Sequence, residues 1–334
     1  MAKSWGGVAA AGRSPANGQD DEAMILTVTL NPCVDKAIAL DHLTLGAFND
    51  AAEAHDVAGG KATNVARMAK HLGAPVRSLV MLGGETGRLV ERLIRAQDGI
   101  EPIVTWTEAP TRNIITVYER ERKRATAYVE PNPAITEREA ADLMRKYADA
   151  LEGTQIVCFG GSAPDRRLDD AYGRMIARAR ERGIRTILDT RGEALRLGVQ
   201  AAPFMVKPNV AESARLLGRP LPDEDARWEA VAWYRSLGIE LVVLSMGKAG
   251  ALIDWAGRRW RATPPRVEEI NPVGSGDCVV AGFACGVLWG WDSEQTIRLA
   301  IAAGAANAAV WDAASPSRAE VEALMTEVTL YQRQ

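Results

Sequence analysis

The chain has 334 residues, of which 47% are hydrophobic and 25% are charged, as is ordinary for a folded globular protein. Lysine and arginine count 40 against 43 acidic residues, so no net basic charge indicates a nucleic-acid partner. The length would allow about two domains, although single α/β domains of this size are common.

Residues 1–23 are rich in small and polar residues, and they contain no apolar run long enough for a secretory signal. We interpret them as a disordered leader, or as the result of a start codon assigned too early. The folded chain is then expected to begin near Met24 and to continue to residue 334.

From Met24 onward, short apolar runs end in polar or glycine-rich residues and alternate with amphipathic stretches. A buried parallel strand is predicted at 25–30, where apolar and β-branched residues follow one another. Repetition of strand, polar end and helix indicates an α/β fold with a doubly wound, mostly parallel central sheet flanked by helices. The other predicted strands are 79–82, 156–159, 186–188, 204–206 and 241–244, and the predicted helices are 64–72, 87–97, 168–182, 278–291 and 297–311.

Two segments, at about 35–50 and 110–130, carry charged residues between their apolar positions. We predict that their strand-like stretches, at 37–40, 113–118 and 126–129, form a small β-sheet outside the main core.

The four cysteines lie in apolar stretches without the close spacing of metal ligands, which indicates reduced core residues of a cytoplasmic protein. None of the three histidines lies near a Gly-x-Ser-x-Gly motif, which argues against serine hydrolase chemistry. The longest apolar run, 278–291, is shorter than the roughly 18 residues of a membrane span. It is therefore predicted to be a buried helix, and no membrane partner is expected.

A glycine turn precedes this run, in Gly274-Ser275-Gly276-Asp277. Glycines allow backbone angles that are closed to other residues, and the first turn of a helix offers unpaired N–H groups and a positive dipole end. Such a turn binds phosphate, and Asp277 would stand beside the anion as a proton acceptor. The alternative is a turn in which Asp277 only caps the helix.

Gly59-Gly60-Lys61-Ala62-Thr63-Asn64 and the Gly-Ser-Gly-Asp segment together resemble the two signatures of the PfkB (ribokinase-like) sugar kinases. The branch of 1-phosphofructokinase and tagatose-6-phosphate kinase is most similar, over about 24–311. Its further marks are Thr29-Leu30-Asn31-Pro32 with Asp35, Lys207-Pro208-Asn209 and Ser245-Met246-Gly247. The resemblance implies a ribokinase-like fold in which the small sheet is a lid over the sugar and often a homodimer surface.

The resemblance implies ATP and Mg²⁺ as cofactors and a sugar phosphate as the small-molecule partner. Asp277 would be the general base, while the amides of Gly274, Ser275 and Gly276 would neutralise the β- and γ-phosphates. Because a helix N-terminus favours a carboxylate, the pKa of Asp277 is expected to stay low.

The acceptor sugar is expected to meet side chains from the first half of the chain. Lys61 and Arg112 are cations that would meet a phosphate on the substrate, the alternative being solvated surface charges. The full expected set is Asp35, Gly59, Gly60, Lys61, Asn64, Arg112 and Ser162.

On the nucleotide side, Glu212 is expected to hold Mg²⁺ through waters, or alternatively to cap a helix. Asn307 is expected either to meet the adenine edge or to bond a neighbouring carbonyl. Asp189 is expected to support the site without performing chemistry. The remaining nucleotide-binding candidates are Lys207, Asn209, Ser245, Gly247 and Gly250.

Several positions depart from the family pattern, among them Ala62, Gly160 and the run 165–167. The resemblance favours conversion of fructose 1-phosphate to fructose 1,6-bisphosphate. Tagatose-6-phosphate or fructose-6-phosphate kinase activity is the near alternative, followed by a kinase of an unphosphorylated sugar or a non-catalytic sugar-phosphate-binding regulator. A Rossmann oxidoreductase is disfavoured, because no Gly-x-Gly-x-x-Gly follows the first strand.

Overall fold

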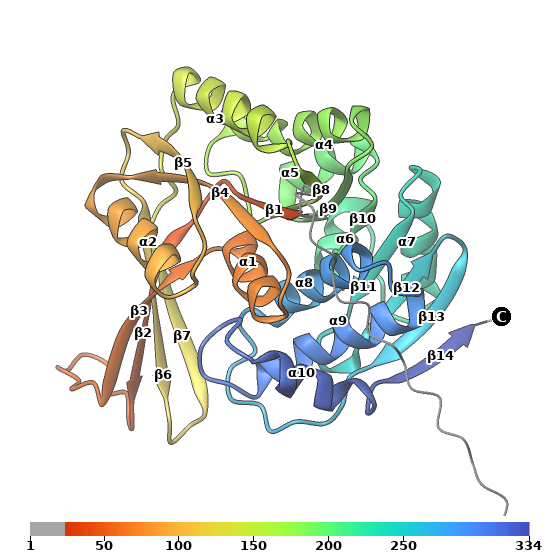
Figure 1. The fold of residues 1–334 in the computed structure, drawn as a ribbon. Coiled ribbons are helices and arrows are strands. Elements are labelled where there is room, and N and C mark those ends of the chain that lie inside the picture. Colours follow the sequence, from red (N-terminus) through yellow and green to blue (C-terminus); the bar gives the residue numbers. More distant parts are fainter. Residues whose placement is uncertain (1–23, 334) are drawn as a thin grey trace, which may run out of the picture.

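A ten-stranded sheet runs through the computed structural model, which describes residues 24–333 (Figure 1). The expected leader, 1–23, lies outside the described residues. The order of strands is β14-β13-β12-β11-β10-β9-β8-β1-β4-β5. Their bounds are β1 Met24–Thr29, β4 Val76–Gly83, β5 Pro102–Thr107, β8 Thr154–Gly160, β9 Arg185–Asp189, β10 Met205–Val206, β11 Leu241–Ser245, β12 Ala251–Trp255, β13 Arg258–Thr263 and β14 Thr329–Arg333.

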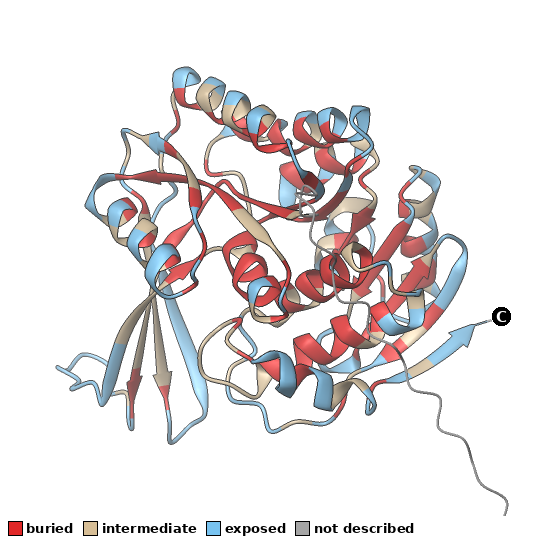
Figure 2. Ribbon diagram, viewed as in Figure 1, coloured by how far each residue is buried: buried red, intermediate tan, exposed pale blue. Residues whose placement is uncertain are grey.

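The strands from β5 to β11 pair in parallel, and β12, β13 and β14 add an antiparallel edge. Neighbouring residues of one strand face opposite cores. Ile25 belongs to the core that includes helices α1 (Lys61–His71), α8 (Ser275–Leu288) and α9 (Ser293–Ala308), whereas Leu26 belongs to the core that includes α3 (Glu137–Ala150), α4 (Ala171–Glu181) and α7 (Glu224–Ser236). Both faces are therefore covered, and Figure 2 shows the buried layer along the sheet. This double burial explains the unbroken apolar runs of the sequence and confirms the predicted fold class.

The helices connect successive strands. Their bounds are α1 Lys61–His71, α2 Gly84–Ala96, α3 Glu137–Ala150, α4 Ala171–Glu181, α5 Gly192–Gly198, α6 Val210–Leu217, α7 Glu224–Ser236, α8 Ser275–Leu288, α9 Ser293–Ala308 and α10 Arg318–Met325. Within residues 24–333, none of them is both long and apolar enough to cross a membrane.

The order of strands reverses beside β1. From β1 the sheet grows to one side through β4 and β5, and to the other side through β8, β9, β10 and β11. In an open α/β sheet such a reversal leaves a crevice at the carboxyl ends of the two central strands. Asn31 follows the end of β1, and Ser162 follows the end of β8.

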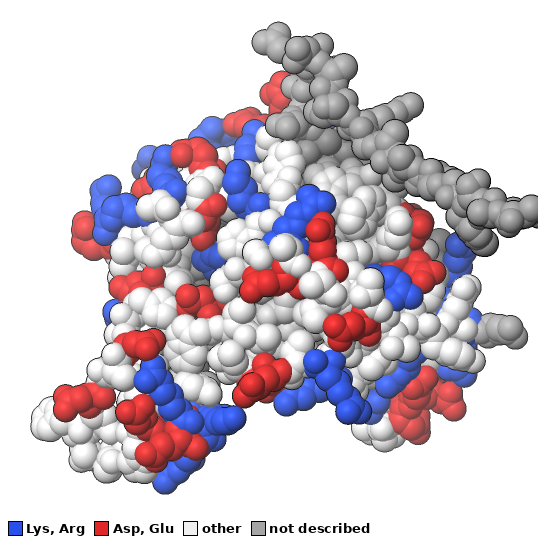
Figure 3. Space-filling view, turned by 60° about the horizontal axis from the view of Figure 1, so that its bottom comes forward, with Lys and Arg blue, Asp and Glu red and all other residues white. Residues whose placement is uncertain are grey.

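A separate four-stranded sheet projects from this edge (Figure 1). Its order is β3-β2-β6-β7, with bounds β2 Cys33–Leu40, β3 Glu53–Gly59, β6 Arg112–Glu119 and β7 Arg124–Val129. At its base, Cys33 pairs with Gly59 and with Arg112, so the small sheet starts beside the crevice. Its far end carries interspersed acidic and basic side chains, visible in the lower left of Figure 3.

Some elements differ from expectation. Residues 41–52 form a loop, and β3, with its mixed composition, carries no strand signal. The helix expected at 297–311 ends at Ala308, and the following residues turn back so that the Ala314 amide donates to Asn307 of α9. β13 and β14 were not predicted, because their charged and aromatic residues lie at a half-exposed sheet edge. β12 was also missed, although four of its five residues are buried.

Candidate active site at the carboxyl edge of the sheet

The Gly-Ser-Gly-Asp segment forms a turn that opens directly into α8. Gly274 has a φ of 85°, which only glycine adopts readily, and the helix begins at Ser275. Within the described residues, the amides of Gly274 and Gly276 have no acceptor, whereas the Ser275 amide donates to Pro272 O at 3.2 Å. The turn therefore offers two free amides, not the three expected from the sequence.

Asp277 lies in the first turn of α8 and is only 5% exposed. One carboxylate oxygen accepts a hydrogen bond from Asn64 Nδ2 at 2.8 Å, and the other lies 4.0 Å from Lys61 Nζ. Burial raises the pKa of Asp277 to about 6, against the lowering effects of Lys61 and Asn64. The expectation of a low pKa was wrong, because desolvation outweighs the helix N-terminus. The group is still mostly ionised at pH 7.

Two lysines converge on a second buried carboxylate. Asp189, at the end of β9, is 2% exposed and receives hydrogen bonds from Lys61 Nζ, 3.0 Å from each oxygen. Lys207 Nζ lies 3.1 Å from the same carboxylate. Burial would raise the pKa of Asp189, but the two lysines lower it overall. Asp189 thus supports the site, as expected from its position.

Lys61 is therefore held between two carboxylates. Burial alone would lower the pKa of its ammonium, but Asp189 and Asp277 raise it above the ordinary value. These contacts place Lys61 beside the proposed base and give no support to the prediction that it meets a phosphate of the substrate.

Arg67 is a functional candidate that the sequence interpretation missed. Its guanidinium is 6% exposed, donates to Asp98 at 2.6 Å and donates through Nη1 to Asn64 Oδ1 at 3.2 Å. The second bond leaves the Asn64 amide nitrogen directed at Asp277. The only signal in the sequence was the spacing of three residues between Asn64 and Arg67 on one helix face.

The side chains expected to bind the sugar lie around the base of the small sheet. Asp35 is half-buried in β2 and accepts a hydrogen bond from Thr116 Oγ1 at 3.3 Å. Burial raises its pKa above the ordinary value. Its free lone pairs can accept from sugar hydroxyls.

The two glycines before α1 have a packing role that the sequence did not indicate. A Cβ at Gly59 would lie 2.5 Å from Cys33 Sγ, and one at Gly60 would lie 2.8 Å from the Thr29 methyl group. The backbone of these two glycines was expected to lie close to a sugar, and in this structure it lies close to the neighbouring strands.

A polar cluster joins Ser162 to the small sheet. Asn132 Oδ1 accepts from Asn31 Nδ2 at 2.9 Å and from Arg112 Nη1 at 3.1 Å. Asn31 Nδ2 also lies 3.5 Å from Ser162 Oγ. Arg112 and Ser162 thus share one hydrogen-bonded cluster, as the sequence interpretation required of residues that bind one substrate.

On the nucleotide side, Asn209 and Glu212 form a capping box at the start of α6, with bonds of 2.8 and 2.9 Å. One carboxylate oxygen of Glu212 is engaged in this cap. Ser245 donates to Pro208 O at 3.3 Å, which joins the ends of β10 and β11. Gly250 is required by packing, because its Cβ would lie 2.0 Å from Ala262 O.

Asn307 follows the second of its two expected roles, a bond to a neighbouring carbonyl. The residue is fully buried, and its amide donates to Val273 O at 2.8 Å and to Ser275 Oγ at 3.0 Å. Its oxygen accepts from the Ala314 amide at 2.6 Å. Asn307 therefore fixes the turn that precedes α8, and these bonds give no support to an adenine contact.

Residues 24–333 contain no cluster of three or more metal-ligating side chains. Glu212 has one carboxylate oxygen outside the capping box and is partly exposed. A single carboxylate fits Mg²⁺, which keeps most of its waters and is bound largely through nucleotide phosphates.

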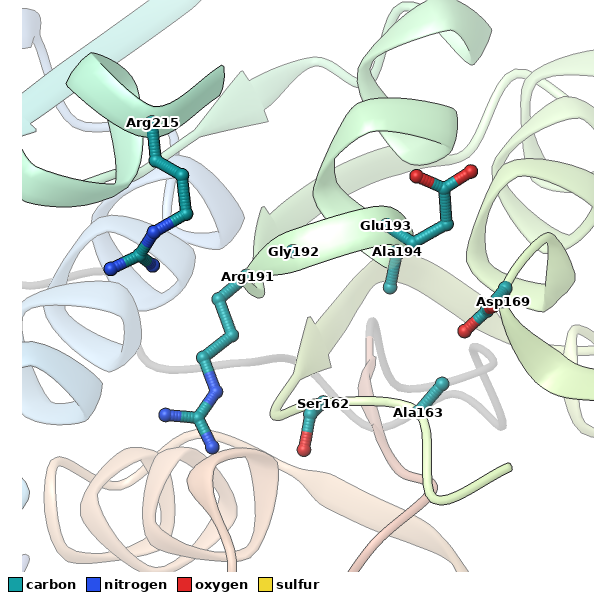
Figure 4. A pocket seen from close by; sticks show the side chains of 8 residues that line it. All are labelled: Ser162, Ala163, Asp169, Arg191, Gly192, Glu193, Ala194 and Arg215. Atoms are coloured by element: carbon teal, nitrogen blue, oxygen red, sulfur yellow. The ribbon is translucent and has the colours of Figure 1, made fainter. Parts of the chain in front are cut away.

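A pocket of about 370 Å³ lies beside Ser162 (Figure 4). Its size is within the range of about 300–1,000 Å³ for small-molecule sites. The guanidinium of Arg191 and the hydroxyl of Ser162 extend to the same side, while Asp169 and Glu193 lie at the other end. Arg191 was not predicted, because no motif in the sequence distinguishes it.

Comparison with known proteins gives a consistent result. A sequence model of the pfkB family of carbohydrate kinases matches residues 28–319. Phosphofructokinase-2 from Escherichia coli, solved in complex with substrates and products, is 26% identical over 91% of this chain and 99% of that chain, with a TM-score of 0.84.

Two more distant structures share the fold. A possible 1-phosphofructokinase from Thermotoga maritima is 22% identical over 93% of this chain and 100% of that chain, with a TM-score of 0.85. Ribokinase from Arabidopsis thaliana, complexed with ribose and ATP, is 20% identical over 91% of this chain and 99% of that chain, with a TM-score of 0.73.

Proposed function

This chain belongs to the pfkB family of carbohydrate kinases, and from that premise we propose that it transfers a phosphoryl group from ATP to a hydroxyl of a phosphorylated ketohexose. The observation that carries the proposal is Asp277, a buried carboxylate beside two free amides and on the same edge of the sheet as Arg112 and Ser162. Fructose 1-phosphate is the proposed substrate, and fructose 1,6-bisphosphate is the proposed product.

Asp277 accepts the proton of the attacking hydroxyl as the phosphoryl group moves across. Lys61, 4.0 Å away, opposes the effect of burial and keeps the carboxylate ionised near neutral pH. The free amides of Gly274 and Gly276 donate to oxygens of the migrating group, where charge develops. Asn307 holds those amides in place through Val273 and Ser275.

Mg²⁺, when bound with the nucleotide, would neutralise charge on the β- and γ-phosphates. We propose Glu212 as the residue that orients it through waters, with Lys207 and Asn209 close to the same nucleotide phosphates. Ser245 and Gly247 are proposed to line the nucleotide. All four cysteines are buried and unpaired, which supports our placing the enzyme in a reducing compartment such as the cytoplasm.

A coupled assay of ADP release with fructose 1-phosphate, fructose 6-phosphate, tagatose 6-phosphate and fructose tests the proposal. The highest kcat/KM is expected with fructose 1-phosphate. The 26% identity to E. coli phosphofructokinase-2, which was also solved in complex with fructose 6-phosphate, favours that sugar as the second candidate. Turnover of fructose alone would reject a phosphorylated substrate, and binding without turnover would indicate a regulator.

The small sheet is also proposed as a homodimer surface. Its edge strand β7 is exposed along its whole length, including Tyr128 and Val129, which are 56% and 57% exposed. An exposed edge strand readily pairs with a second copy. Sedimentation equilibrium of the wild type and of Tyr128→Arg tests this, and a monomeric wild type would reject it.

A further inference from the structure

Arg112 and Arg191 both lie near Ser162, the first through the Asn31–Asn132 cluster and the second in the pocket that Ser162 lines. Arg112 begins β6, and its Nε is buried with no hydrogen-bond acceptor. Arg191 follows the end of β9 and is exposed. Within residues 24–333, neither guanidinium forms an ion pair, whereas many other arginines of the chain pair with Asp or Glu.

The two positive charges influence each other. Burial lowers the pKa of Arg112 below its ordinary value, and the charge of Arg191 lowers it further. Guanidinium groups remain charged in proteins, so the repulsion persists. An anion bound between them would offset this repulsion and would satisfy the buried Nε of Arg112.

Neutral hydrogen-bonding groups surround the same point. Ser162 Oγ extends to the same side of the pocket as the Arg191 guanidinium (Figure 4). Asn31, 4% exposed, joins Ser162 to Asn132, and its Oδ1 is buried without a partner. Together these residues supply the guanidinium groups of two arginines, the Ser162 hydroxyl and the buried Asn31 Oδ1, which can accept a hydrogen bond from a sugar hydroxyl.

We propose that Arg191 is the second guanidinium of a clamp that, with Arg112 and Ser162, binds the phosphate already present on the sugar substrate. The proposal rests on the function proposed above and deepens it by naming the group that selects phosphorylated sugars. A phosphate monoester carries a charge of about −1.5 to −2 and three acceptor oxygens, enough for two guanidinium forks and a hydroxyl.

The position of the clamp fits a substrate with its phosphate at one end and its reacting hydroxyl at the other. Gly161 precedes Ser162, and a Cβ built on it would lie 3.9 Å from Lys61 Cβ. The Lys61 ammonium in turn lies 4.0 Å from Asp277. The clamp and the base therefore both lie next to Lys61, whose ammonium is itself committed to Asp189 and takes no part in the clamp.

The test compares Arg191→Gln, Arg191→Lys and Arg112→Gln with a control, Arg178→Gln. Arg178 lies on α4, is exposed and does not line the pocket beside Ser162. Kinetics are measured with the best phosphorylated sugar and with fructose, and binding of the sugar phosphate is measured by calorimetry. Circular dichroism and melting temperature show whether each variant is folded.

For Arg191→Gln, loss of a charged hydrogen bond should raise the KM and Kd for the sugar phosphate about 10- to 100-fold. The KM for ATP should change little, and the preference for phosphorylated sugar over fructose should fall by the same factor. Arg191→Lys should be intermediate, because lysine keeps the charge but not the fork. Arg178→Gln should behave as the wild type.

An unchanged preference in Arg191→Gln would overturn the clamp while leaving the proposed function intact, provided that the wild type phosphorylates sugar phosphates. Equal losses with fructose and with sugar phosphate would also overturn it, because they indicate a structural role. If the wild type neither binds nor phosphorylates any sugar phosphate, the proposed function fails and the clamp fails with it.

Discussion

Replacement of Lys61 by glutamine should move the pH dependence of turnover. The ammonium lies 4.0 Å from an Asp277 oxygen, and two unit charges at that distance interact by about 4 kcal/mol at an effective dielectric constant of about 20. The Lys61 side chain is 37% exposed, so solvent screening reduces this value, and we take about 2–4 kcal/mol. Loss of that interaction raises the pKa of Asp277 by about 1.5–3 units.

The direction of the shift in the pH profile follows from the role of the Asp277 carboxylate. Asp277 must be ionised to accept a proton, and its pKa of about 6 leaves the wild type active at pH 7. In Lys61→Gln the acid limb of kcat should shift upward by about 1.5–3 pH units, which lowers turnover at pH 7 by about 4- to 100-fold. Activity should return as the pH rises to about 10, because the base is intact.

The assay is a discontinuous measurement of the phosphorylated product between pH 5 and pH 10, with both substrates saturating. Saturation limits interference from the phosphate of the sugar, which itself titrates near about pH 6. Lys70→Gln is the matched control, because Lys70 lies on the same helix α1 and is exposed. It should keep the wild-type profile.

An acid limb that stays near pH 6 in Lys61→Gln would refute the reasoning. If the KM for the sugar phosphate rose instead, with an unchanged pH profile, Lys61 would be a phosphate ligand, as the sequence first suggested. The two roles are thus separated by one pH series.

Three further predictions concern the base, the turn and the metal. Asp277→Asn should lower turnover by at least ~100-fold, with nearly unchanged ATP affinity by calorimetry, and normal turnover would remove the base assignment. The variant should also melt at a higher temperature, because an ionised buried carboxylate with a raised pKa is destabilising. Asn307→Leu loses the bonds to Val273, Ser275 and Ala314. The free energy of unfolding in urea should therefore fall by about 1–3 kcal/mol, and the KM for ATP should rise. A wild-type free energy of unfolding and a wild-type KM would show that the turn holds without Asn307. Glu212→Gln keeps the oxygen that caps α6, so its stability should be that of the wild type. It should require several-fold more free Mg²⁺ for half-maximal rate. An unchanged Mg²⁺ titration would leave Glu212 as a helix cap alone.

The sequence determined the architecture and the position of the chemistry. Short apolar and β-branched runs that end in polar residues are typical of strands buried on both faces, so 25–30 and 241–244 could be placed in a parallel sheet before any contact was known. The Gly-Ser-Gly-Asp motif marks the turn and the start of α8 through residues adjacent in the chain, and both lie where expected, although the bonds from Asn307 that hold the turn come from a distant helix. The strands β13 and β14 escaped prediction because half-exposed strands carry mixed residues.

Tertiary structure alone decided what each charged side chain does. Asp277, Asp189, Lys61 and Lys207 lie far apart in the chain, and the balance between burial and ion pairing that sets their pKa values exists only when the strand ends meet. For the same reason Arg191, which belongs to no motif, gains a proposed role from the pocket that it shares with Ser162, near Arg112. Local sequence fixes backbone conformation, whereas desolvation and charge at a site depend on groups that folding brings together.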